Sequence, residues 1–178
     1  MTKTAFTLTD LLDLAEKSAV DGLVDRQMKS IMPTFHLISP DRKHDTLVAT
    51  PWDGDMEKRL AVTKVRQMAR EMKATAVCFS SEVWMLVLPP GVDYAPDRPS
   101  QSPNRIEGVI IVATDGKETK ARSLLTIRDK PGGKVLRLDR DPKVPDDDGS
   151  QYDSWMLEDI IMLAKRPKPY IPDGDKYP

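Results

Sequence analysis

The segment TAVCFSSEVWMLVL, residues 75–88, is the longest run of apolar and β-favouring residues in the chain. It predicts a central strand covered on both faces, because a half-exposed strand would alternate apolar with polar residues. The middle of the run carries Ser80, Ser81 and Glu82. A carboxylate inside a buried strand needs a partner or an opening to water. Glu82 is therefore the first candidate for a functional residue.

The residues before this strand predict helices around a hairpin. Thr7 and Asp10 have the spacing of a capping box, and apolar residues recur at helical spacing after them, with a second helical segment expected before Pro33. Residues 34–38 and 46–50 predict the two strands of a hairpin. Residues 56–73 form a second amphipathic pattern, which predicts a helix capped by Asp53 or Asp55.

The residues after the central strand predict a meander. Residues 89–104 contain five prolines and predict a long loop, and strands are expected at 105–114, 117–128 and 134–138, with turns at Asp115-Gly116 and residues 131–133. On the strand 117–128, Glu118, Lys120, Arg122, Thr126 and Arg128 are expected to face water. A last helix is expected over 154–166. The fold class is α+β, a largely antiparallel mixed sheet (an N-terminal hairpin plus a C-terminal four-strand meander) with helices packed mainly on one side.

Length and composition are those of one globular unit. The 178 residues are 39% hydrophobic and 31% charged, which predicts a single α+β domain over residues 1–166 and a proline-rich tail over 167–178. No apolar run reaches the roughly 18 residues that span a bilayer, and the N-terminus lacks the pattern of a secretory signal. The single cysteine, Cys78, is expected to be a small core residue. A cytoplasmic location and no membrane partner are expected.

The sequence offers little for a metal or a cofactor. Phosphate-binding glycine loops and a nucleophile elbow are absent, so no cofactor is predicted. The chain has two histidines, and a set of His36, His44 and Asp45 could form across the first hairpin. Because it lacks a recognised ligand motif, the prediction is that the chain has no metal site.

A catalytic constellation is a second hypothesis for the central strand. If residues 75–88 pair antiparallel with 105–114, then Glu82, Glu107 and Arg105 could approach one another. Two carboxyl groups with an arginine beside them can form an acid–base site, and a structural ion pair is the alternative interpretation. The candidate binding residues are Ser81, Trp84 and Arg98.

The middle of the chain resembles a family of uncharacterised small proteins encoded by phages, prophages and related bacterial elements. The resemblance lies in a Ser-Glu-x-Trp strand, a Pro-Ser-x-x-Pro-x-Arg-x-Glu segment and a glycine turn, which here are Ser81, Glu82, Trp84, Pro99, Ser100, Pro103, Arg105, Glu107 and Gly116. It covers about the middle quarter of the chain. Asn104 stands where a charged residue is usual. The family has no established activity, so the resemblance implies kinship and draws attention to Glu82 and Arg105.

Three functions follow as hypotheses. The first is a non-enzymatic cytoplasmic interaction or accessory protein, linked to a phage or mobile element, with a protein partner or self-association. The second is a hydrolase-like enzyme that uses Glu82, Glu107 and Arg105, with or without a divalent metal. The third is binding of an anionic polymer such as nucleic acid by residues 114–140, which have a net charge of +4 from eight basic and four acidic residues.

Overall fold

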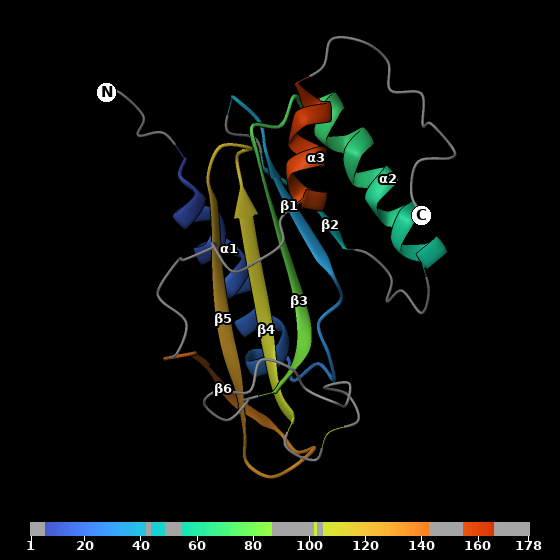
Figure 1. Ribbon diagram of the computed structural model, residues 1–178. Coiled ribbons are helices and arrows are strands. Elements are labelled where there is room, and N and C mark those ends of the chain that lie inside the picture. The colour runs from blue at the N-terminus through green and yellow to red at the C-terminus, as the bar shows by residue number, and fades with distance from the viewer. Residues whose placement is uncertain are drawn as a thin grey trace, which may run out of the picture.

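The computed structural model describes residues 6–41, 44–48, 55–86, 102, 105–142 and 155–165. Figure 1 shows a long sheet with helices on both sides. In chain order the elements are α1 (Leu8–Val20), the π-helix η1 (Asp21–Asp25), β1 (Thr34–Ile38), β2 (His44–Val48), α2 (Asp55–Met72), β3 (Ala76–Leu86), β4 (Arg105–Thr114), β5 (Thr119–Arg128), β6 (Val135–Arg140) and α3 (Trp155–Ala164). The protein is therefore of the α+β class.

The sheet has six strands in the order β2-β1-β3-β4-β5-β6, and every neighbouring pair is antiparallel. The predicted hairpin and the predicted four-strand meander thus join into one sheet through the β1–β3 pairing. The central pair is the longest, because β3 and β4 stay in register from Val77 opposite Thr114 to Leu86 opposite Arg105. Residues 87 and 88 of the predicted strand lie outside the described residues.

Both faces of the sheet are covered, and the strand residues alternate between two apolar cores. One core joins α1 and η1 to one face, with Leu11, Leu12, Leu23, Cys78, Val109, Ile111 and Leu124 fully buried. The other joins α2 and α3 to the opposite face, with Phe35, Leu37, Val65, Val77, Ile160 and Ile161 fully buried. Figure 1 shows α1 behind the sheet, with α2 and α3 side by side across it. The expectation of helices mainly on one side is therefore wrong, whereas cover on both faces of β3 is confirmed.

The cover by α1 also corrects the prediction for Arg122. Arg122 was expected to face water, but its side chain is only 3% exposed and its guanidinium pairs with Asp13 at 2.8 Å and Glu16 at 2.5 Å, both on α1. Leu124 follows on the same face and is fully buried. The alternation along β5 was correctly phased, but its second face meets a helix instead of solvent.

Local sequence accounts for most element boundaries. The capping box is present, with the Thr7 hydroxyl accepting from the Asp10 N–H and the Asp10 carboxylate accepting from the Thr7 N–H. The segment after Asp21 is the short π-helix η1, which ends at Asp25 and replaces the longer second helical segment expected before Pro33. The strand β2 begins at His44, two residues earlier than predicted.

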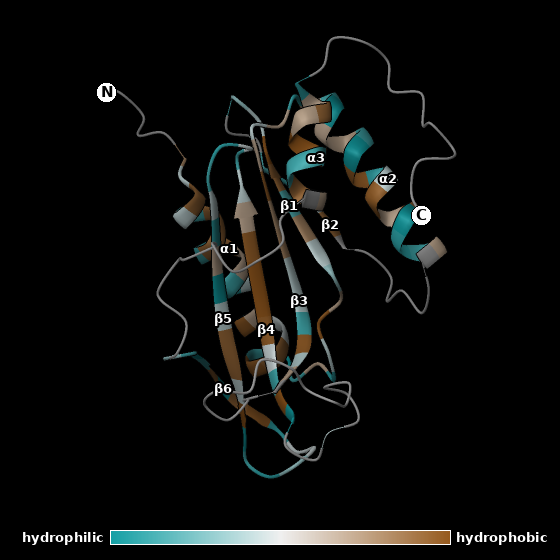
Figure 2. Ribbon diagram, viewed as in Figure 1, coloured by the Kyte–Doolittle hydropathy of each residue, from teal (hydrophilic) through white to brown (hydrophobic). Residues whose placement is uncertain are grey.

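Hydropathy follows the layers. Figure 2 shows hydrophobic residues along β4 and bands of hydrophilic residues on α2. On the outer layer, Arg66 of α2 is nearly buried and pairs with Asp159 of α3, which ties the two helices together. Within the described residues, no helix has both the length and the apolar character that crossing a membrane requires. The predicted boundary at residue 166 and the tail 167–178 lie outside the described residues.

Candidate functional site

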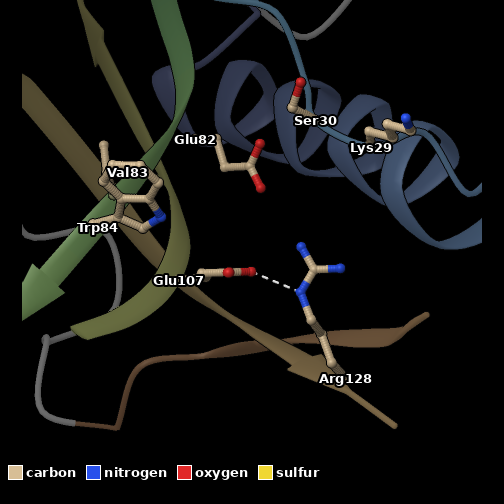
Figure 3. Close-up of a pocket in the computed structure, with 7 residues that line it drawn as sticks. All are labelled: Lys29, Ser30, Glu82, Val83, Trp84, Glu107 and Arg128. Carbon is tan, nitrogen blue, oxygen red and sulfur yellow. Dashed lines mark hydrogen bonds and ion pairs between the residues drawn. The ribbon is translucent and has the colours of Figure 1, made fainter. Parts of the chain in front are cut away.

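A pocket of about 330 Å³ lies at the end of the α1-covered face, beyond η1. Its lining comes from the segment after η1 and from β3, β4 and β5, namely Lys29, Ser30, Glu82, Val83, Trp84, Glu107 and Arg128. Figure 3 shows the carboxyl groups of Glu82 and Glu107 and the guanidinium of Arg128 directed into the same space. We call this space the Glu82 pocket.

Glu82 reaches the pocket from the middle of β3, where it sits opposite Val109 of β4. Its side chain is half-buried, and one carboxyl oxygen accepts a hydrogen bond from the Ile31 N–H at 3.3 Å. Burial is the main reason that the pKa of Glu82 is raised, and the nearby charge of Glu107 raises it further. The Ile31 hydrogen bond and the charge of Arg128 oppose the rise without cancelling it. Glu82 is therefore a carboxyl group that holds its proton more firmly than usual.

Glu107 is in a different environment because Arg128 pairs with it. The Arg128 Nε donates to a Glu107 carboxyl oxygen at 2.6 Å, and the same guanidinium donates to the Gly133 carbonyl at 2.7 Å. The Glu107 side chain is 31% exposed and that of Arg128 is 18% exposed, so the pair is partly shielded from water. A charge-assisted bond of this kind is shorter and stronger than a hydrogen bond between neutral groups, and it fixes the position of the Glu107 carboxyl group.

The arginine of the site is not the one that the sequence suggested. Arg105 sits opposite Leu86, and its guanidinium lies over the ring of Trp84, 5.3 Å from the centroid, in a cation–π contact. Glu82 and Glu107 are brought together as predicted, but Arg128 supplies the cation. Its only signal in the sequence was its place at the end of the strand that follows β4, and its side chain, expected to face water, is partly buried at the pocket with 18% exposed.

The structure does not bring the predicted binding residues together at one site. Trp84 lies opposite Glu107 on β4, lines the Glu82 pocket and is 50% exposed. Ser81 alternates with Glu82 and so belongs to the other face of the strand, where its hydroxyl donates to the Glu82 carbonyl at 3.2 Å. Arg98 lies outside the described residues.

The two histidines meet across the first hairpin. The His36 Nδ1 and the His44 Nε2 are 3.1 Å apart, and the rings lie at an interplanar angle of 18°. Burial, followed by the charge of His44, lowers the pKa of His36 to about 4. Asp45 does not join them, since its carboxylate accepts from the Thr46 N–H on the opposite face of β2. Among the described residues, no three or more His, Cys, Asp or Glu side chains converge as a metal site.

At least half of the basic residues of the stretch 114–140 form ion pairs within the fold. Arg122 and Arg140 both pair with Glu16 of α1, Arg128 pairs with Glu107, and Arg137 pairs with Asp139. These four of the eight basic residues are therefore paired, three of them with carboxylates from outside the segment. The net charge of the segment is for this reason larger than the charge that it presents to a polyanion.

The site and the fold define a small α+β protein with a six-stranded antiparallel sheet, covered on both faces, and a pocket lined by two glutamates, a lysine and an arginine where the cover of one face ends. Comparisons of this chain with protein-family models, with curated proteins and with solved structures found no significant match.

Proposed function

We propose that this protein is a non-enzymatic binding protein and that the Glu82 pocket receives a basic group of a partner protein. The observation that supports this most directly is the state of Glu82. It is half-buried, it forms no ion pair with any described residue, and its one described hydrogen bond comes from a backbone N–H. A half-buried carboxylate whose charge is not matched by a direct ion pair costs free energy, and an incoming ammonium or guanidinium group that pairs with it would recover that cost.

Trp84 supports the same proposal. Its ring is half exposed at the pocket and already carries the guanidinium of Arg105. An indole beside a carboxylate is a favourable combination for a basic side chain, because the ring attracts the cation and covers its apolar stem. An accessory role of this kind agrees with the resemblance to phage-encoded proteins, whose Ser-Glu-x-Trp strand contains Glu82 and Trp84, and with a cytoplasmic location.

The test is a titration of the isotopically labelled protein with N-acetyl-arginine amide and N-acetyl-lysine amide, followed by NMR. We expect saturable shifts of the Trp84 indole N–H and of the Ile31 amide. Glu82→Gln should weaken binding about tenfold, which is the loss of one charge-assisted bond. Glu57→Gln on the exposed side of α2 is the matched control and should leave it unchanged. Shifts that scatter over the surface, or that survive Glu82→Gln, would overturn the proposal.

A second candidate is a hydrolase-like enzyme, and one observation favours it. The pocket places its two carboxyl groups in different environments, since Glu82 is half-buried with a raised pKa and Glu107 is paired with Arg128. This is the arrangement of a general acid beside a general base. Glu82 would donate a proton to a leaving group, and Glu107 would activate water.

This candidate is tested with nitrophenyl esters, glycosides and phosphodiesters as probes. Hydrolysis by the mechanism above would fall on both sides of a pH optimum and would be lost in Glu82→Gln and in Glu107→Gln. Calorimetry with Mn²⁺ and Mg²⁺ tests the metal-assisted form. Turnover that either variant retains would exclude this pocket as the catalyst.

A further inference from the structure

The hairpin β1–β2 holds three donor atoms in a small triangle, away from the Glu82 pocket. The His36 Nδ1 and the His44 Nε2 are 3.1 Å apart, and the Thr46 hydroxyl oxygen lies 3.1 Å from the His44 Nε2 and 3.3 Å from the His36 Nδ1. Each imidazole offers a lone pair at this position in the tautomer that keeps its proton on the other ring nitrogen, and the Thr46 oxygen offers one in either case. The cross-strand register produces the triangle, because His36 sits directly opposite Thr46 and His44 lies two residues before it on the same face.

These distances suit a tetrahedral metal centre. Zinc binds imidazole nitrogen at about 2.0–2.1 Å, so two ligands of a tetrahedral ion lie about 3.3 Å apart. All three sides of the triangle fall at or just below that value. A hydrogen bond joins the His36 Nδ1 and the His44 Nε2 at this spacing. His44 and Thr46 are exposed on the edge strand, where the His44 ring can turn towards an ion.

The two histidines differ in a way that suits a binding site. His36 is 3% exposed, packed in the sheet opposite Cys78 of β3, and its Nε2 has no described hydrogen-bond partner. The donor that meets His44 and Thr46 is the other ring nitrogen, Nδ1, and the buried Nε2 carries the proton when Nδ1 offers its lone pair. Fixed His36 and adaptable, exposed His44 together provide one rigid ligand and one mobile ligand.

We propose that His36, His44 and the Thr46 hydroxyl bind a single Zn²⁺ ion at the edge of the sheet, with water in the remaining position. Imidazole ligands favour zinc over magnesium or calcium, which prefer oxygen. The open water position lies on the solvent side of β2. The ion would link the edge strand to β1.

The chain is well suited to a decisive test, because it has only two histidines and one cysteine. The full chain is titrated with ZnCl₂ in a buffer free of chelators, by calorimetry and by NMR of the histidine ring protons. We expect one equivalent of Zn²⁺ to bind, to raise the melting temperature and to shift the ring signals of both histidines, with full reversal by EDTA.

Variants on the exposed strand distinguish coordination at this site from zinc bound elsewhere on the protein. His44→Gln, which changes an exposed residue, should weaken binding at least about tenfold, and Thr46→Val should weaken it less. Asp45→Asn lies on the opposite face and Cys78→Ala removes the buried thiol, and both should retain wild-type affinity. Absence of saturable binding, or binding that His44→Gln leaves intact, would overturn the proposal and would leave the two histidines as a hydrogen-bonded pair only. Neither outcome bears on the Glu82 pocket.

Discussion

Removing the two carboxylates that pair with Arg122 should cost more stability than removing the arginine itself. The asymmetry follows from exposure. Arg122 is 3% exposed, whereas its partners on α1 are reached by water, with Glu16 25% and Asp13 59% exposed. When one side of this ion pair is removed, the charged group that remains must be solvated by water. Water reaches the two carboxylates but does not reach the Arg122 guanidinium.

The magnitudes follow from that difference. In the double variant Asp13→Asn, Glu16→Gln, a buried guanidinium loses both carboxylates of α1, and breaking a buried ion pair from one side costs about 3–5 kcal/mol. Arg122→Met keeps much of the apolar stem, removes the buried charge and leaves two solvated carboxylates, so its cost should stay below about 2 kcal/mol. For a chain of this length the double variant should melt roughly 6–20 °C lower than the wild type.

The assay is urea unfolding, followed by tryptophan fluorescence and circular dichroism. The triple variant, with Met at 122 as well as Asn and Gln at 13 and 16, completes the cycle. It should recover most of the stability lost in the double variant, because the buried charge is no longer there to be compensated. If Arg122→Met costs as much as the double variant, or if the triple variant is as unstable as the sum of the others, the burial argument is refuted.

Three further predictions test other parts of the structure. The pKa of Glu82 is raised above 4.5, so the wild type loses stability as the pH rises through that pKa. Glu82→Gln should therefore melt at a higher temperature than the wild type at pH 8 and at the same temperature at pH 3. A lower melting temperature of the variant at pH 8 would contradict this. A Cβ on Gly108 would lie 2.5 Å from the Leu124 carbonyl oxygen, so Gly108→Ala should lower the free energy of unfolding in urea by at least about 2 kcal/mol. Gly132 has a φ of +66° with open space around it, so Gly132→Ala should lower it by about 1 kcal/mol. Burial raises the pKa of the Cys78 thiol well above its usual range, so a thiol reagent should label the protein only in denaturant, and rapid labelling of the native state would show that the core opens.

The elements could be predicted where a local signal defined both ends. The strand over residues 105–114 was predicted with its observed bounds, and the capping box at Thr7 placed the start of α1. Both depend on interactions within a few residues. The start of β2 was missed by two residues, since no local residue marks it and its pairing with β1 decides where it begins.

The arrangement of helices could not be predicted in the same way. A polar residue at every second position of β5 shows that its two faces differ. The same pattern arises whether the charged residues form buried ion pairs or face water. Arg122 and Arg128 were therefore both assigned to water. Their carboxylate partners come from α1, more than 100 residues earlier, and from the neighbouring strand β4, and only the tertiary fold brings those groups to them.

The candidate site was half predictable for a related reason. Glu82 and Glu107 lie on strands that follow one another, so antiparallel pairing alone brings them close. Arg128 was not predictable, because its contact with Glu107 depends on the register of a third strand, β5, against β4.

The position of the pocket follows from where the first helical segment ends. Cys78 and Glu82 are on the same face of β3, four residues apart, yet Cys78 is fully buried under α1 and Glu82 opens into the pocket. Between them the cover changes, because η1 ends at Asp25 and Gln27 takes a φ of +53° that turns the chain. The turned segment is fixed to the sheet at two points, by the Gln27 side-chain amide donating to the Val135 carbonyl and by the Ile31 N–H donating to Glu82. The change from apolar to polar residues within TAVCFSSEVWML thus marks the edge of the helical cover, and Glu82 itself holds the segment that forms the pocket wall.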